Sequence, residues 1–175
     1  MRKRLANMPG KLMRCKLRGT HAPRSLKFAT WGLISGTLSI LAIFAVTDLA
    51  GFPLLIGSFG ASAVLLFGAN DSPLAQPRNL VGGHLISAAA AVVIVALFGS
   101  NPFTIAAAVG IAIFLMDVTR TTHPPGGATA LIGVQGAAGF DFVLIPVLAG
   151  ALILLAVALL TNNVVHHRQY PKHWL

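Results

Sequence analysis

The chain has 175 residues, of which 55% are apolar and 10% are charged, and its mean hydropathy is +0.79. This composition excludes an ordinary soluble domain, in which about a quarter of the residues are charged, and a disordered chain, which has low hydrophobicity. The net charge is +9, from 13 Lys and Arg against four acidic residues. All the acidic residues are Asp, so chemistry that needs paired Glu carboxylates is excluded.

The positive charge is concentrated at the N-terminus. Nine of the 13 basic residues lie in residues 1–27, with no acidic residue among them. The stretch lacks the short apolar core and cleavage site of a secretory signal, and we interpret it as a basic cytoplasmic arm. An organelle transit peptide and a basic amphipathic helix on anionic lipid are the alternatives. No nucleic-acid partner is expected, because the charge serves as a signal for membrane orientation.

After the arm, long apolar segments predict membrane-spanning helices, since a helix needs about 20 apolar residues to cross the bilayer core. Four such segments occur in chain order, at about 28–47, 79–98, 102–118 and 142–161. Two shorter segments, 52–69 and 121–139, contain Gly and Pro and predict short, broken or re-entrant helices. The sequence therefore predicts an all-α polytopic membrane protein with four long spans and two short helices.

Lys and Arg predict the topology, because cytoplasmic loops carry an excess of them. The arm and the C-terminal tail, residues 162–175, are both basic, so we expect both termini in the cytoplasm and an even number of crossings. Six crossings obey the rule better than four do, because they put Arg78 and Arg120 inside and two of the aspartates outside. We expect a transmembrane domain at 28–161, in a bacterial inner membrane.

The two halves of the transmembrane domain resemble each other. The string at 60–65, Gly-Ala-Ser-Ala-Val-Leu, is matched at 127–132 by Gly-Ala-Thr-Ala-Leu-Ile. Each half also reads as a long helix, a short Gly/Ala helix and a long helix, which predicts two internal repeats at about 28–98 and 102–161. Such duplication is common in transporters, whose site lies near the midplane where broken helices of both halves meet. An odd number of crossings per half would make the repeats inverted, and an even number would make them parallel.

The most distinctive string runs from residue 120 to residue 131 and includes His123, Pro124, Pro125, Gly126 and Gly127. Pro is favoured at the first helical position, so a helix is predicted to begin at the two prolines. The N–H groups that follow them would be free, and a helix N-terminus is a ready anion site. The first half offers a similar start near Ser58 and Gly60. Two such ends meeting in the middle of the membrane would hold a small anion without any full charge.

This string resembles the signature of the HPP family of integral membrane proteins, which is named for His-Pro-Pro. The resemblance extends to residues 57–69, 72–79 and 82–84, and it covers about 28–161. It implies four transmembrane helices and a membrane transporter, and some photosynthetic members of the family are associated with nitrite transport. The family's motif residues in this chain are His123, Pro124 and Pro125.

Four polar residues are further candidates for the site, each with a structural alternative. Arg78 and Arg120 flank the motif blocks, and charge at membrane depth usually marks function. Both also lie at segment ends, where the alternative is a snorkelling topology marker. His123 either gates or donates to an anion, or it caps the short helix. His84 follows two glycines in an apolar helix, where it either lines a pore or hydrogen-bonds a neighbouring helix.

The sequence therefore predicts a channel or transporter for a small monovalent anion, with nitrite as the leading candidate through the resemblance. The alternative is a non-transporting membrane scaffold or sensor, and an intramembrane enzyme is the least supported class. The sequence shows no nucleophile–base pair, phosphate loop or metal-ligand cluster, so no catalytic residue, metal or cofactor is expected. The expected partners are a small inorganic anion and the lipid bilayer, and the chain works either alone or as a homo-oligomer.

Overall fold

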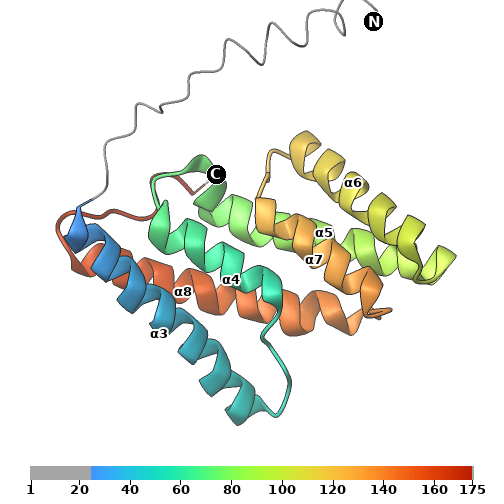
Figure 1. The fold of residues 1–175 in the computed structure, drawn as a ribbon, viewed down its shortest axis with the longest axis horizontal. Helices are drawn as coiled ribbons and strands as arrows, with labels where there is room; N and C mark the ends of the chain where they lie inside the picture. The colour runs from blue at the N-terminus through green and yellow to red at the C-terminus, as the bar shows by residue number, and fades with distance from the viewer. Residues whose placement is uncertain (1–24, 175) are drawn as a thin grey trace, which may run out of the picture.

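The computed structural model describes residues 25–174, so most of the predicted basic arm lies outside the described residues. The described chain consists of helices and connecting loops, without a strand (Figure 1). Its α-helices are α3 (Leu26–Ala50), α4 (Gly57–Ala63), α5 (Pro77–Phe98), α6 (Pro102–Val118), α7 (Pro124–Gln135) and α8 (Ala149–Val164). Shorter π- or 3-10-helical segments are η1 (Val64–Gly68), which continues α4, η2 (Pro73–Ala75), and η3 (Val143–Leu148), which leads into α8.

Three helices in the described part are long and apolar enough to cross a membrane, namely α3, α5 and the segment Val143–Val164, which is kinked at Ile145. Helix α6 has 17 residues, which is the lower limit of the range for a span. The pair α4–η1 and the 12-residue α7 are too short to cross a hydrocarbon core of about 30 Å. The all-α membrane fold is confirmed, and the predicted span at 102–118 is the shorter helix α6.

Local sequence signals define the helix ends. The Ser25 side chain accepts the hydrogen bond of a first-turn N–H and caps α3, which ends where Gly51 adopts left-handed backbone with a φ of 72°. Asn101 and Thr104 form a reciprocal capping box at the start of α6. Three helices begin with a proline, at Pro77 in α5, Pro102 in α6 and Pro124 in α7. The missing N–H of proline is harmless at that position.

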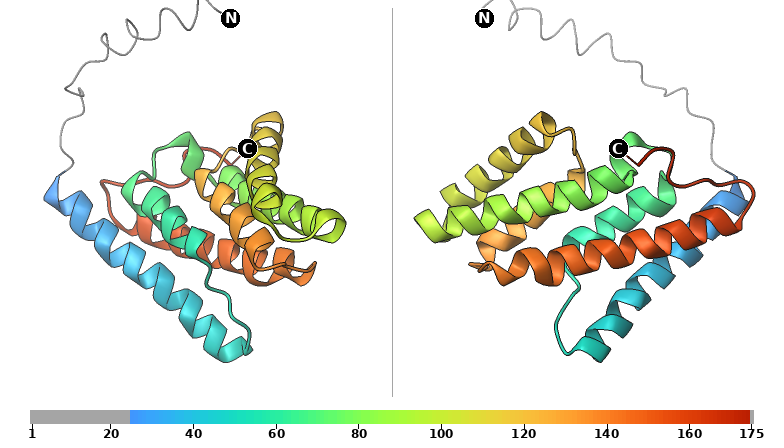
Figure 2. Two further views of the ribbon diagram at one scale, coloured as in Figure 1. Left: turned by 45° about the vertical axis from the view of Figure 1, so that its right-hand side comes forward. Right: turned by 180° about the vertical axis from the view of Figure 1, so that it is seen from behind.

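Successive helices alternate in direction between the two ends of the bundle (Figure 1, Figure 2). One end carries Arg78 and is called the basic end below. There the Arg78 side chain donates to the Thr119 carbonyl at 2.8 Å, which joins the start of α5 to the end of α6. The Asn79 side chain donates to the Thr122 carbonyl at 2.8 Å, which brings the start of α7 to the same end. Each half of the chain thus runs through three helices of alternating direction, and the internal repeat itself stays a prediction.

The C-terminal segment folds back on the basic end. Helix α8 continues beyond the predicted domain boundary and ends at Val164. After it, Arg168 and Tyr170 are buried. The segment 162–175, which the sequence predicts as a cytoplasmic tail, is therefore anchored to the bundle through these two side chains.

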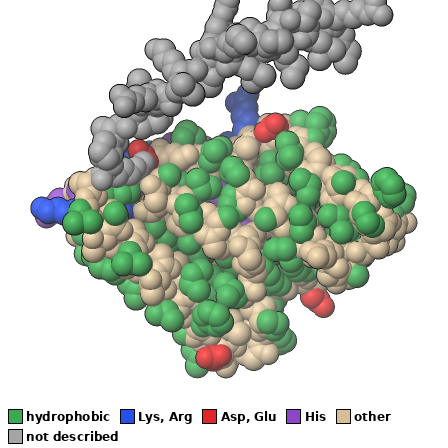
Figure 3. Space-filling model, viewed as in Figure 1, with side chains coloured by type: hydrophobic (Ala, Val, Ile, Leu, Met, Phe, Trp, Pro, Cys, Tyr) green, Lys and Arg blue, Asp and Glu red, His purple; other side chains and the backbone are tan. Residues whose placement is uncertain are grey.

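Two apolar clusters fill the bundle. One lies between α3, α4–η1 and α8 and includes Phe59 and Leu154. The other lies between α5, α6 and α7 and includes Met116 and Val134. Hydrophobic side chains also cover much of the face seen in Figure 3, where the charged groups lie at the edges. Helices that are apolar on their outer surface as well as inside are typical of a bundle embedded in lipid.

Candidate functional site

A cluster of buried polar side chains lies where α4, α5 and α7 meet. Its members are Ser58 and Ser62 of α4, His84 of α5, and His123 and Thr129 at the start and in the middle of α7. Each of these residues is at most 1% exposed. Buried polar groups are costly unless they are hydrogen-bonded, and inside a membrane protein they are seldom incidental.

Ser62 lies between two imidazole rings. Its Oγ is 2.8 Å from Nε2 of His84 and 2.9 Å from Nε2 of His123. The two rings contact edge to face, with their centroids 4.9 Å apart and their planes at 62°. The Phe59 ring packs on His84 in the same manner, with a centroid distance of 5.2 Å. A single hydroxyl thus links the two imidazoles.

The outer nitrogens of both rings are also bonded. Nδ1 of His84 is 2.7 Å from Oγ1 of Thr129, which is 2.8 Å from Oγ of Ser58. Nδ1 of His123 is 2.8 Å from the carbonyl oxygen of Leu74. Because a carbonyl oxygen can only accept, Nδ1 of His123 carries a hydrogen and donates it. A neutral His123 therefore presents Nε2 as an acceptor.

Helical spacing and the matched strings explain how the sequence places the hydroxyls. Ser58 and Ser62 are four residues apart and share one face of α4. Ser62 and Thr129 occupy the same position in the strings 60–65 and 127–132, and they bond opposite nitrogens of His84. The sequence prediction did not include Ser62 and Thr129 among the site residues, and this match is the signal that identifies them.

Glycines bring α5 and α7 close enough for the cluster to form. A Cβ added at Gly83 would lie 2.5 Å from Cβ of His123 and 2.8 Å from the carbonyl oxygen of Thr121. A Cβ added at Gly126 would lie 2.7 Å from Oγ of Ser87. Any larger residue would push the helices apart. Gly126, which was predicted to face an anion, is therefore needed for helix packing.

The N-terminal ends of α4 and α7 do not meet (Figure 1). Gly57 begins α4 and lies beside Ile132 in the second half of α7, since a Cβ built at Gly57 is 3.8 Å from Cδ1 of Ile132. Ser62, near the end of α4, contacts His123 at the start of α7. In addition, the N–H of Gly126 donates to the His123 carbonyl at 2.8 Å and is not free. The predicted anion site between two helix N-termini is wrong, because the two short helices run antiparallel.

The remaining residues of the predicted motif lie outside the cluster. Pro124 and Pro125 form the first turn of α7. Gly127 borders a mainly apolar hollow of about 530 Å³ between α6 and α7. Gly60 is exposed on α4, and a Cβ built on it would meet nothing within 4 Å.

Arg78 and Arg120 lie on the surface of the basic end. Both side chains are exposed, and Arg120 adopts left-handed backbone, with a φ of 56°, in the turn between α6 and α7. Among the described residues, no hydrogen bond joins either guanidinium to the cluster. The structure thus brings together Ser58, His84 and His123 of the predicted site and leaves the two arginines at its approach.

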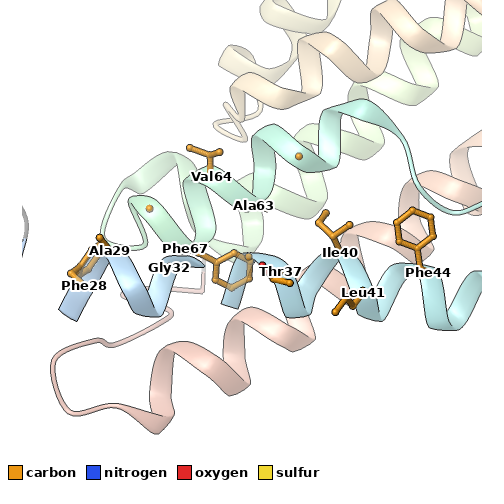
Figure 4. A pocket seen from close by; sticks show the side chains of 13 residues that line it. Phe28, Ala29, Gly32, Thr37, Ile40, Leu41, Phe44, Ala63, Val64 and Phe67 are labelled. Atoms are coloured by element: carbon orange, nitrogen blue, oxygen red, sulfur yellow. The ribbon is translucent and has the colours of Figure 1, made fainter. Parts of the chain in front are cut away.

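An apolar groove of about 740 Å³ runs between α3 and α4–η1 (Figure 4). Ile40 and Phe44 of α3 lie on one side of it, and Phe67 of η1 lies on the other. Thr37 supplies the one polar side chain among the residues that line the groove. The groove therefore offers nothing that would recognise an anion, although it is larger than the other hollows described.

The chemistry available in the cluster is hydrogen bonding. Two imidazoles and three hydroxyls come together there without a carboxylate. Within residues 25–174, no group of three His, Cys, Asp or Glu side chains is placed to hold a metal ion. Such a set of groups can bind a small hydrogen-bonding solute or hold a proton.

The fold and the cluster define a polytopic helical membrane protein with a buried polar site. The chain belongs to the HPP family, because the family described as HPP, transmembrane region, matches residues 21–171. The family resemblance seen in the sequence is thereby confirmed.

Two transmembrane proteins of Dictyostelium discoideum are similar to the chain. One is 52% identical over 133 residues, which cover 71% of this chain and 47% of that protein. The other is 46% identical over 156 residues, which cover 82% of this chain and 50% of that protein. The chain thus spans about half the length of these relatives. No solved structure matches the chain.

Proposed function

We propose that the chain is a channel or transporter for a small monovalent anion and that the buried polar cluster is the place where the anion is desolvated and gated. The observation that carries the proposal is the cluster itself, in which hydrogen-bonding side chains lie fully buried inside an apolar membrane bundle. A protein that only had to span the membrane would be better served by apolar packing, which avoids the cost of desolvating polar groups. Nitrite is the leading candidate because of the family resemblance.

The electrostatics of the molecule favour an anion over a cation. Arg78 and Arg120 would draw anions towards the basic end, where α7 begins. His123 is the N-cap residue of α7, and the positive end of a helix dipole favours negative charge. By the positive-inside rule, we propose that the basic end faces the cytoplasm. The bacterial inner membrane and the homo-oligomer stay predictions.

We propose transport rather than catalysis, although Ser62 and His123 have the spacing of a nucleophile and its base. Ser62 is fully buried, and a second imidazole, from His84, occupies its other side. Neither the groove beside α3 nor the hollow between α6 and α7 includes Ser62 among its lining residues. A closed site of this kind suits a carrier with alternating access, which passes through a state sealed from both sides.

The direct test is uptake of nitrite by liposomes that contain the purified protein, with protein-free liposomes as background and nitrate, formate and chloride as comparison anions. We expect His123→Ala to lower nitrite uptake at least about tenfold, the change that about 1.4 kcal/mol in barrier height produces. Arg120→Gln should lower uptake less, because its exposed charge acts only at the approach. His166→Ala is the matched control, since His166 is exposed at the end of α8 and should leave uptake unchanged.

Two results would contradict the proposal at different levels. No uptake of any of these anions would overturn transport and favour the non-transporting scaffold or sensor. Unchanged nitrite uptake by His123→Ala, with the variant eluting as a folded protein, would keep transport and overturn the assigned site.

A further inference from the structure

We propose that the His84–Ser62–His123 cluster holds one exchangeable proton and that the protein moves its anion together with this proton. The inference rests on the proposed transport function and adds the coupling ion to it. It is carried by the hydrogen bonds of the cluster, which can be satisfied both with and without an extra proton.

With both rings neutral, the direction of the bonds around Ser62 is fixed. His123 donates from Nδ1 to Leu74, so its Nε2 accepts the hydrogen of Ser62. Ser62 has then given its only hydrogen, so His84 must donate to it from Nε2. The Nδ1 of His84 is left as an acceptor.

The contact between Thr129 and Ser58 favours an additional hydrogen on His84. In the neutral state, Thr129 gives its only hydrogen to Nδ1 of His84, so it has none for Ser58. The 2.8 Å contact, however, has the geometry of donation from Thr129 to Ser58. That direction is available when His84 carries hydrogens on both nitrogens and donates to both Ser62 and Thr129.

The other ring can also carry the proton. If His123 carries it, Ser62 accepts from both imidazoles and turns its own hydrogen to the Ser58 carbonyl oxygen, 3.2 Å away in the same helix. No heavy atom has to move in either case. Two protons would place like charges on rings only 4.9 Å apart, which is unfavourable. The cluster is therefore built to share a single proton between His84 and His123 through Ser62.

The surroundings of the rings explain why the proton would travel with an anion. The other ionisable side chains on the packed elements, their connecting loops and the C-terminal segment are Lys27, Asp48, Asp71, Arg78, Asp117, Arg120, Asp141, His166, His167, Arg168, Tyr170, Lys172 and His173. In the described part of the chain, no hydrogen bond joins any of these side chains to either imidazole. A buried imidazolium without a counter-charge is costly, and a bound monovalent anion would supply that charge. Proton and anion binding would then favour each other reciprocally.

The test uses liposomes that contain the purified full chain and a trapped pH dye, with nitrite as the probe and equal pH on both sides. We expect nitrite entry to acidify the lumen, with one proton for each nitrite. Because the pair is electrically neutral, a membrane potential imposed with valinomycin and potassium should leave the nitrite rate unchanged. Protein-free liposomes correct for nitrous acid that crosses the bilayer without protein.

The failures of the two proposals are distinguishable. Nitrite uptake without protein-dependent acidification, at a rate that follows the imposed potential, would overturn proton coupling and leave the transport function intact. No uptake of nitrite, nitrate, formate or chloride would overturn both.

Variants locate the proton within the cluster. His84→Gln keeps a hydrogen-bonding side chain but cannot hold a proton, and Ser62→Ala removes the shared hydroxyl. Because each change prevents the proton from passing between the two rings through Ser62, we expect both variants to lose the acidification that accompanies nitrite, whereas the exposed His166→Gln should retain it. Acidification per nitrite that is unchanged in His84→Gln would overturn the assignment.

A measurement on the unmodified protein covers the case in which a core variant does not fold. In protein with ¹⁵N-labelled histidines in lipid nanodiscs, the ring nitrogens report protonation directly. We expect His84 and His123 to take up one proton between them, and nitrite to shift that uptake to higher pH. The proposal would be overturned if both imidazoles stayed neutral over the pH range in which the rate of nitrite uptake changes.

Discussion

The two sides of the bundle are packed in opposite ways. In the most apolar stretch of each helix, 50% of the residues of α5 are buried, against 17% in α3. Helix α5 meets α7 across Gly83 and Gly126, which leave no room for a methyl group. Helix α3 instead stands beside α4 across an open apolar groove (Figure 4). The comparison assigns the sides different tasks, since the tight side positions the imidazoles and the loose side faces lipid.

The largest difference between the two sides is expected when one methyl group is added to each of them. Gly83→Ala should destabilise the protein by about 3 kcal/mol or more, because the new Cβ would collide with His123 and Thr121. Gly60→Ala, the matched change beside the groove, should alter stability by less than about 0.5 kcal/mol, because nothing lies within 4 Å. Thermal unfolding of both variants in the same detergent measures the difference. Equal melting temperatures would show that the α5–α7 contact is not tighter than the α3–α4 side.

A second prediction asks what holds the loosely packed α3 to the bundle. Arg168 donates to the carbonyl oxygens of Phe67 at 2.9 Å and Phe28 at 2.6 Å and to Oδ1 of Asn162 at 2.9 Å, and it stacks on the Phe28 ring. Arg168→Ala should therefore cost about 3 kcal/mol, because buried acceptors lose a charged donor. Hydrogen exchange should rise first in α3.

The matched control for Arg168 is Lys172→Ala. Among the described residues, the Lys172 ammonium makes only an exposed contact with Gln169, so its loss should change stability by less than about 0.5 kcal/mol. If Arg168→Ala melts like this control and α3 exchanges as in the wild type, the C-terminal segment does not clamp α3.

The smallest effect is expected from the other buried side chain of the C-terminal segment. The Tyr170 hydroxyl donates to the Ala75 carbonyl at 2.8 Å, so Tyr170→Phe should cost about 1 kcal/mol at neutral pH. Burial raises the pKa of this hydroxyl above its ordinary value of 10.0. The unfolded chain therefore loses the proton first as the pH rises, and the contribution of Tyr170 to stability is lost progressively above about pH 10.

Melting temperatures of the wild type and Tyr170→Phe between neutral pH and about pH 11 check this sign. The advantage of the wild type should shrink as the medium becomes alkaline. A difference that stays constant would mean that the hydroxyl titrates alike in the folded and unfolded chains.

The sequence predicted part of the site and misjudged how it is assembled. His84 stood out because polar side chains are rare in such an apolar segment, His123 stood out because it belongs to the most distinctive string, and both lie in the cluster. Gly126 was predicted to present a free N–H to an anion, whereas the structure shows that it allows α5 and α7 to pack closely. Two prolines in the sequence indicate a helix start with free N–H groups. They do not indicate that α5 and α7 pack so closely that a methyl group would not fit between them.

The sequence alone determined the membrane class, the positions of the spans and the family, because hydropathy and sequence motifs are properties of consecutive residues. Tertiary structure alone decided which polar groups meet. Ser62 joins His84 to His123 only because three helices converge with α4 antiparallel to α7. Arg168, which a charge count places in a solvated tail, is buried because carbonyl oxygens from two distant helices happen to face it. Such acceptors lie on the backbone, so no pattern of side chains along the sequence can reveal them.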